Sequence, residues 1–172
     1  MDNVLVAYFS RAGENYGHGG IIHLEKGNTE ILAEAIADDL DAQLFKIEAV
    51  NPYPKDYYAT TDQAKVELRE DARPEISGPL PDMSGIDTIV LGYPNWWGLA
   101  PMPVKTFLDS IDTTGIKICP FCTNEGSGLG GSVRDLSRTY PAAKVMAGLS
   151  VRGTDAARSC KKAQDWARKS AR

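Results

Sequence analysis

Five apolar segments of five or six residues alternate along the chain with segments of helical periodicity, and this alternation constrains the fold more than any other feature. Strands are predicted at residues 4–9, 43–47, 88–93, 116–121 and 144–149, and helices at 29–40, 55–69, 101–111, 132–138 and 155–169. Such an order implies parallel strands joined by right-handed crossovers, with helices on both faces. We therefore predict an α/β fold with three layers, built on a doubly wound, five-stranded parallel sheet of strand order 2-1-3-4-5.

In that strand order, the winding direction reverses between the first and third strands. Ligands of open α/β sheets bind at such a switch point, outside the carboxyl ends of the strands. The first predicted strand ends at Ser10 and the third ends at Pro94. The loops that follow these two strands are therefore the first places in which to look for a site.

Length and composition bound the remaining possibilities. The 172 residues fit one domain, residues 1–172, and a formal net charge of −4 without basic runs argues against a nucleic-acid or anionic-membrane partner. No apolar stretch is long enough for a transmembrane helix, and residues 1–3 lead into a strand without a signal-peptide pattern. Three cysteines form an odd and sparse set, which indicates a reducing compartment. We expect a cytoplasmic protein, and the oligomeric state, monomer or dimer, stays open.

The loop after the third strand is rich in aromatic surface, with the sequence Pro94, Asn95, Trp96, Trp97 and Gly98. Proline cannot continue a central ladder, so the chain must leave the sheet at Pro94. Packing against the next helix could account for one indole, but a single packing face cannot bury two adjacent rings equally. At least one indole is therefore expected to be exposed, where a flat aromatic ligand could stack on it.

The loop after the first strand carries groups suited to an anion. Ser10 lies at its beginning, and Asn28 and Thr29 open the next helix, whose unpaired N–H groups and dipole favour a phosphate. Arg11 could add a positive charge or could simply be solvated. Residues 14–27 are rich in glycine and lack helical periodicity, so they are predicted to form a loop insertion, with Asn28 as the N-cap of the helix.

The loop after the fourth strand, residues 123–128, contains glycines that leave backbone N–H and C=O groups accessible. The three loops together describe a slot for a planar heterocycle with a phosphate tail. The chain lacks both the triphosphate-binding loop pattern and the Gly-x-Gly-x-x-Gly fingerprint after its first strand. A serine hydrolase is disfavoured because Glu125 stands where the nucleophile motif requires glycine.

The ordered combination of these motifs resembles the flavodoxin family of FMN proteins over essentially the whole chain. The motifs are Tyr-Phe-Ser-Arg at 8–11, Gly-Asn-Thr at 27–29, Tyr-Pro-Asn-Trp-Trp-Gly at 93–98 and Pro-Phe-Cys-Thr at 120–123. The resemblance implies noncovalent FMN, with its phosphate held by Ser10, Arg11, Ala12, Asn28 and Thr29. It implies that two further segments border the isoalloxazine: Pro94 to Gly98, and Thr123, Asn124, Glu125, Gly126, Ser127 and Gly128. The insertion at 14–27 departs from the short family pattern.

Three functions remain open at this point. The leading one is an electron-transfer flavodoxin that exchanges electrons with redox partner proteins, with the flavin supplying the chemistry. The second is an NAD(P)H-dependent FMN reductase acting on small quinone-like or nitro acceptors, and the mild net charge of −4 favours it somewhat. The third, a non-flavin regulatory module, is disfavoured because a phosphoacceptor site would need paired acidic residues after the first strand, where Ser10-Arg11 stands.

Two further sets of residues could carry chemistry. The insertion would bring Tyr16, His18 and His23 near the flavin edge, where a histidine could relay a proton, although surface positions are the simpler expectation. Cys119 and Cys122 have the spacing of a dithiol motif. Redox pairs of this kind need a helix N-terminus to lower the pKa, whereas these residues belong to a strand, so we expect buried, inert thiols.

Overall fold

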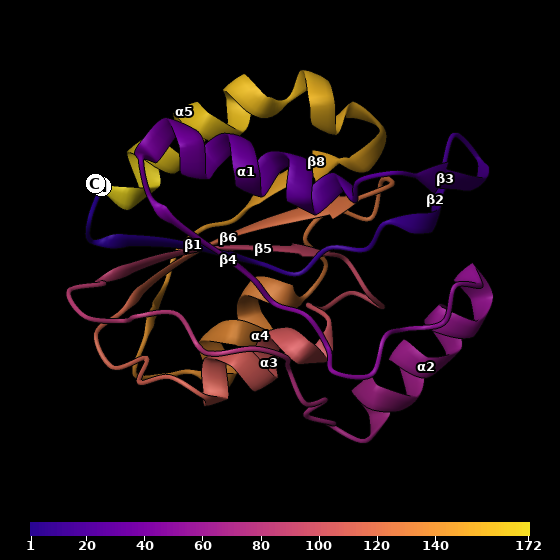
Figure 1. Ribbon diagram of the computed structural model, residues 1–172, viewed down its shortest axis with the longest axis horizontal. Coiled ribbons are helices and arrows are strands. Elements are labelled where there is room, and N and C mark those ends of the chain that lie inside the picture. The colour runs from indigo at the N-terminus through magenta and orange to yellow at the C-terminus, as the bar shows by residue number, and fades with distance from the viewer.

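In the computed structural model, which describes residues 1–172, a parallel sheet lies between two layers of helices (Figure 1). The sheet order is β4-β1-β5-β6-β7, and β8 also pairs with β6. The strands are β1 (Val4–Tyr8), β4 (Gln43–Lys46), β5 (Thr88–Pro94), β6 (Lys117–Asn124), β7 (Lys144–Val145) and β8 (Leu149–Arg152). When β7 and β8 are counted together as the fifth strand, the predicted order 2-1-3-4-5 is confirmed.

The pleat of the central strands divides their side chains between two core clusters. Alternate residues of β1, and of Phe9 that follows it, take opposite sides: Val4, Val6 and Tyr8 belong to one cluster, and Leu5, Ala7 and Phe9 to the other. The first cluster lies beneath α1 (Asn28–Leu40) and α5 (Cys160–Ala171), and the second beneath α3 (Met102–Asp109) and α4 (Ser132–Thr139). A near-continuous apolar strand is therefore buried on both faces, as expected for the centre of a parallel sheet.

The fifth strand is interrupted, which the sequence did not predict. The carbonyl of Ile118 on β6 accepts a hydrogen bond from the Met146 N–H, so the backbone of Ile118 faces the fifth strand. Two residues later Pro120 faces the same side and has no N–H to donate. The ladder stops there and resumes when β8 pairs with residues 121–124 of β6.

Residues 14–27 do not form the predicted loop insertion. They contain most of an antiparallel hairpin of β2 (Gly13–Gly17) and β3 (Gly20–Leu24), separate from the main sheet. The two turn residues, His18 and Gly19, have φ values of 51° and 80°. Two positive φ angles are what a tight two-residue hairpin turn requires.

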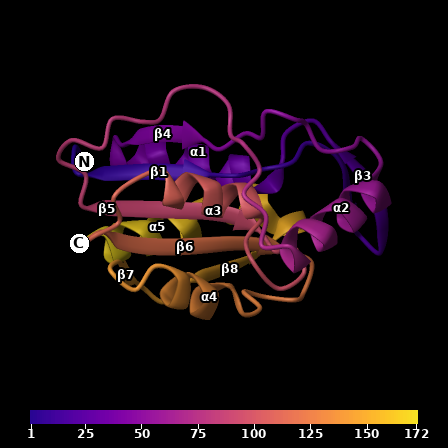
Figure 2. The same cartoon turned by 90° about the horizontal axis from the view of Figure 1, so that it is seen from below.

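Helix α2 (Tyr57–Arg69) stands apart from the sheet, beside the hairpin and beyond the strand ends (Figure 2). The Asp56 carboxylate caps it by accepting a hydrogen bond from the Ala59 N–H at 2.7 Å. The predicted C-terminal helix is shorter than expected, because residues Gly153–Arg158 form the 3₁₀ helix η1 and α5 begins at Cys160. None of the helices has both the length and the apolar character needed to cross a membrane.

Candidate functional site

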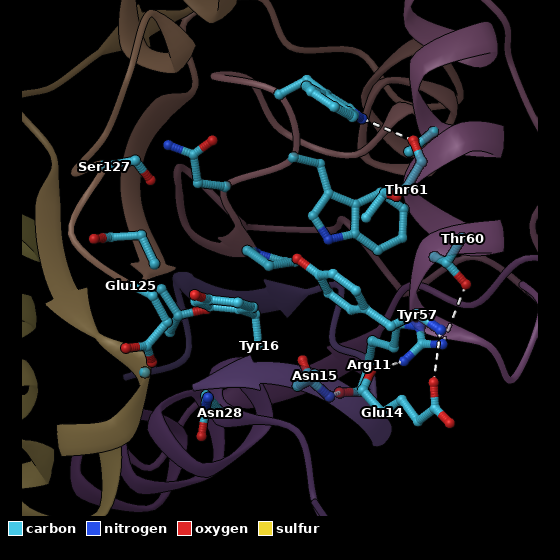
Figure 3. A pocket seen from close by; sticks show the side chains of 18 of the residues that line it. Arg11, Glu14, Asn15, Tyr16, Asn28, Tyr57, Thr60, Thr61, Glu125 and Ser127 are labelled. Carbon is cyan, nitrogen blue, oxygen red and sulfur yellow. Dashed lines mark hydrogen bonds between the residues drawn. The ribbon is translucent and has the colours of Figure 1, made fainter. Parts of the chain in front are cut away.

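A cavity of about 530 Å³ opens at the carboxyl edge of the sheet, where the loops after β1, β5 and β6 meet (Figure 3). Its volume lies within the range of small-molecule sites. Ten of the sixteen predicted cofactor-binding residues form part of its wall: Arg11, Asn28, Pro94, Asn95, Trp96, Trp97, Thr123, Asn124, Glu125 and Ser127. The remaining six, Ser10, Ala12, Thr29, Gly98, Gly126 and Gly128, lie outside the wall.

The two ends of the first loop cross each other at the start of α1. Gly27 is the N-cap, so the prediction that Asn28 caps the helix is wrong, and Asn28 is instead its first residue. A Cβ at Gly27 would lie 2.1 Å from the Ser10 hydroxyl oxygen, which shows how closely the beginning and the end of the loop approach each other. The Ser10 hydroxyl accepts a hydrogen bond from the Glu30 N–H. The N–H groups of Asn28 and Thr29 have no protein acceptor and remain free for an anion.

Arg11 connects the first loop to helix α2. Its guanidinium donates hydrogen bonds to the carbonyl oxygens of Glu14, Pro54 and Lys55 and to the Thr60 hydroxyl. In return, the Glu14 carboxylate accepts a hydrogen bond from the Tyr57 N–H at 2.7 Å. These contacts fasten the hairpin to the beginning of α2, and they direct the guanidinium toward α2. A phosphate contact by Arg11 stays a prediction.

The two tryptophans of the second loop have different environments. Trp96 packs edge-on against Phe9 and Tyr53, with ring centroids 5.1 and 5.0 Å away. Trp97 is 51% exposed, and its indole N–H donates a hydrogen bond of 2.8 Å to the Thr61 carbonyl of α2. The backbone of Trp97 is left-handed, with φ 56°, an uncommon conformation for a large residue. The expectation that one indole is exposed is confirmed, and the exposed ring is that of Trp97.

The third loop is ordered by side chains at its start. The Asn124 side-chain oxygen accepts hydrogen bonds from the N–H groups of Gly126 and Gly128. The Glu125 carboxylate accepts one from the Thr154 N–H at 2.9 Å, and the Arg152 guanidinium lies 3.7 Å away. Glu125 therefore joins this loop to η1.

Three charged residues line the cavity, and each of them is engaged with protein groups. Arg11 and Glu14 connect the hairpin to α2, and Glu125 connects the third loop to η1. The free donors at the α1 end are backbone amides, because the Thr29 hydroxyl is buried and hydrogen-bonded with that of Thr123 at 2.8 Å. The field of the α1 N-terminus is thus the main attraction for an anion at this end.

Nine wall residues were not among the sixteen predicted: Glu14, Asn15, Tyr16, Tyr57, Tyr58, Thr60, Thr61, Ala64 and Gly153. Tyr16 was expected near the site, whereas the five α2 residues were missed because that helix appeared to face solvent. Two adjacent tyrosines at the start of a polar helix were the one local signal. The histidines lie outside the wall, and the His23 side chain is 68% exposed.

The two thiols of β6 are fully buried, as expected for inert cysteines. Burial raises the pKa of Cys119 to about 11 and the pKa of Cys122 to about 12. Both groups are therefore protonated at neutral pH, and the thiol form is a poor nucleophile.

The fold and the cavity define a doubly wound α/β protein with a cavity at the topological switch point, where open α/β sheets bind their ligands. The chain belongs to the flavodoxin family, whose model matches residues 3–169. None of the curated proteins is similar enough to the chain to match it.

Several solved structures resemble the chain. A putative flavoprotein from Bacteroides uniformis is 26% identical, with 97% of this chain and 98% of that chain covered and a TM-score of 0.76. One from Bacteroides eggerthii is also 26% identical, with coverage of 100% and 99% and a TM-score of 0.76. A flavoprotein from Lactobacillus acidophilus in complex with FMN is 23% identical, with coverage of 90% and 96% and a TM-score of 0.70. At that identity the Lactobacillus structure shows a shared fold.

Proposed function

We propose that the chain binds FMN noncovalently in this cavity and acts in electron transfer. The observation that carries the proposal is that one cavity has free helix amides at one end and an exposed indole at the other. Phosphate and an aromatic ring system are the two groups that such ends recognise. Family membership and the FMN-bound Lactobacillus flavoprotein support the same cofactor.

The residues at the site fit this cofactor. At the α1 end, the amides of Asn28 and Thr29 lie at the positive end of the helix dipole. The close approach of Gly27 to Ser10 keeps these amides beside the first loop. Ser10, Arg11, Ala12, Asn28 and Thr29 would hold the phosphate. The segments Pro94–Gly98 and Thr123–Gly128 would border the isoalloxazine. FMN supplies the electron-transfer chemistry when bound.

The charges around the cavity bear on the reduction potential. Glu125 carries a negative charge in the wall, and the guanidinium of Arg11 is directed to α2. The wall itself holds no uncommitted cation, and the Lys65 ammonium lies outside it, 4.9 Å from the centroid of the Trp97 ring. The two carboxylates in the wall therefore disfavour additional negative charge on the bound ring. We therefore expect a low potential, as suits a strong reductant.

A reductase of small quinone-like or nitro acceptors is the second candidate function. The hairpin and α2 favour it, since residues of both line the cavity. In the carrier function, redox partner proteins would deliver and accept the electrons. NAD(P)H oxidation by the purified holoprotein with a quinone acceptor separates the two, because a carrier needs a separate reductase.

FMN binding is tested by titrating the apoprotein with FMN and following the loss of flavin fluorescence. An anaerobic reductive titration followed by absorbance then reports stoichiometry and potential. Protein that stays colourless and leaves FMN fluorescence unchanged would refute the proposed function.

A further inference from the structure

Asn95 is the one residue whose side chain forms hydrogen bonds in both of the loops that follow β5 and β6. Its amide oxygen accepts a hydrogen bond from the Gly98 N–H at 2.8 Å, within its own loop. Its amide nitrogen donates one to the Gly128 carbonyl at 2.9 Å, in the loop after β6. Both polar atoms of the amide are therefore engaged by backbone groups, one in each loop.

A second asparagine anchors the loop after β6 to the sheet. The Asn124 amide oxygen accepts a hydrogen bond from the Gly128 N–H, and its amide nitrogen donates one to the Ser150 hydroxyl of β8. The backbone of Gly128 thus lies between two asparagine side chains, with its N–H bonded to Asn124 and its carbonyl to Asn95. Because Asn124 ties Gly128 to β8, the carbonyl to which Asn95 donates is a fixed support.

Trp97 is the residue that most needs such a support. Its backbone is left-handed, with φ 56°, and that of Gly98 has φ 87°. A large residue keeps a left-handed conformation only where its surroundings over-determine it. The Asn95–Gly98 hydrogen bond spans Trp97, and the direction of the Gly98 N–H is set by ψ of Trp97. The Asn95 amide therefore fixes that angle directly.

The orientation of the Trp97 ring depends on hydrogen bonds rather than on packing. Half of the residue is exposed at the cavity, and its indole N–H is bonded to the Thr61 carbonyl of α2 (Figure 3). On the backbone side, hydrogen bonds lead from β8 through Asn124, Gly128 and Asn95 to the turn at Trp97. Asn95 is the link in the middle of this path.

Backbone contacts also join the two loops, at a different point. The Gly98 carbonyl accepts a hydrogen bond from the Gly131 N–H at 2.9 Å, and a Cβ at Gly130 would lie 2.5 Å from that carbonyl oxygen. These contacts hold the carbonyl of Gly98 beside the beginning of α4. The peptide unit between Trp97 and Gly98 is held instead by the Asn95 amide.

We infer that Asn95 is a positioning residue, whose amide ties the loop after β5 to Gly128 and thereby fixes the Trp97 ring for stacking on the flavin. This inference rests on the proposed function. Without the amide, the left-handed turn can relax in the free protein and must form again when the ligand binds. The loss of the amide is therefore expected to appear as weaker FMN binding.

The first test asks whether Asn95 acts through Trp97. In fluorescence titrations with FMN, Asn95→Ala should raise the Kd about 5- to 30-fold, the equivalent of one to two hydrogen bonds. In a Trp97→Ala background the same substitution should raise the Kd less than about 2-fold, because the residue through which Asn95 acts is then absent. Equal effects in the two backgrounds would overturn the inference.

The second test separates the two hydrogen bonds of the amide. In Asn95→Asp the ionised carboxylate can accept from the Gly98 N–H but cannot donate to the Gly128 carbonyl, whereas the protonated carboxyl can do both. Placement against that carbonyl raises the pKa of the introduced carboxyl. The Cys122 thiol, 3.8 Å from the same carbonyl oxygen, has a pKa of about 12 and stays protonated throughout.

The Kd of each variant is divided by that of the unmodified protein at the same pH, which cancels the titration of the FMN phosphate. From pH 8 to pH 5.5 the ratio for Asn95→Asp should fall about 3-fold or more, as the donated hydrogen bond returns. The ratio for Asn95→Ala should stay constant. Asn51→Asp adds the same charge at an exposed position outside the wall, and its ratio should stay near one.

Amide hydrogen exchange of the apoprotein tests the coupling without a ligand. Asn95→Ala should speed exchange of the Gly98 N–H and also of the Gly128 N–H, which is bonded to Asn124 rather than to Asn95. Unchanged exchange at Gly128, or a pH-independent ratio for Asn95→Asp, would overturn the inference and leave the proposed function standing. Failure of the unmodified protein to bind FMN would refute the proposed function, and exchange at Gly128 would still decide whether Asn95 couples the loops.

Discussion

Replacing Gly27 by alanine tests whether the close crossing at the start of α1 builds the phosphate end of the cavity. The backbone of Gly27, with φ −63° and ψ 149°, is open to any residue, so the substitution introduces no conformational strain. The new Cβ would lie 2.1 Å from the Ser10 hydroxyl oxygen and 2.8 Å from the Arg11 carbonyl oxygen. The hydroxyl can rotate away only by giving up the Glu30 N–H, and the carbonyl belongs to the backbone. The two ends of the loop must therefore separate.

Overpacking of this kind costs about 1–3 kcal/mol. In the free protein the loop can relax by moving apart, whereas FMN binding requires the Asn28 and Thr29 amides to return beside Ser10. The cost therefore falls largely on binding, and the Kd for FMN should rise about 5- to 150-fold. Fluorescence titration of the apoprotein measures it, and urea unfolding of the same protein reports any change in stability.

Gly20→Ala is the matched control for this substitution. Gly20 begins β3 and has no neighbouring atom within 4 Å of a Cβ at its position. The control should bind FMN as the unmodified protein does, with stability unchanged or raised by about 0.4–1 kcal/mol through the unfolded state. A Gly27→Ala protein with unmodified FMN affinity would refute the assignment of the phosphate to this crossing.

Three further tests have definite expected outcomes. Trp97→Ala should weaken FMN binding by about 1–3 kcal/mol, the value of one lost stacking contact. Trp96→Ala should lower the free energy of unfolding by about 3 kcal/mol, because that partly buried ring packs edge-on against Phe9 and Tyr53 beside the core. Urea unfolding and FMN titration of both variants distinguish the two roles. Lys105→Met leaves the Asp135 carboxylate, 2.9 Å from the Lys105 ammonium, without its partner and should cost about 3–5 kcal/mol, and adding Asp135→Leu should recover most of this loss in urea unfolding. The two thiols of β6 should resist alkylation of the native protein at pH 8, which is below both raised pKa values, and rapid labelling seen by mass spectrometry would contradict their burial.

The central sheet could be predicted from the sequence because the patterns that specify its strands and helices each lie within one short segment of the chain. Continuous apolar runs specify strands that are buried on both faces, and the helical stripes between them specify the layers. The interruption of the fifth strand depends on Pro120, which lies in the neighbouring strand β6. Because Pro120 removes the hydrogen bond from its own strand, nothing in the sequence of the fifth strand signals the interruption.

The hairpin and the role of α2 could not be predicted for a related reason. Residues 13–24 are polar and rich in glycine, so they lack the apolar alternation of a strand, and their pairing depends on the turn at His18 and Gly19. The contacts that place α2 at the cavity join Arg11 to residues 43 to 49 positions away in the chain. Local periodicity shows that α2 is a helix and does not show which face it turns toward the site.

The cavity therefore combines two parts of different physical origin. The amides of α1 and the loops after β5 and β6 are continuous with the core, so the fold itself fixes their positions. The hairpin and α2 are attached by a few hydrogen bonds, which Arg11 and Trp97 donate and the Glu14 carboxylate accepts, and they bury little apolar surface. Substitutions on this outer wall can change what binds there at little cost to the core. The inner part suits a constant cofactor, and the outer part suits the ligand that distinguishes this chain from other proteins with the same fold.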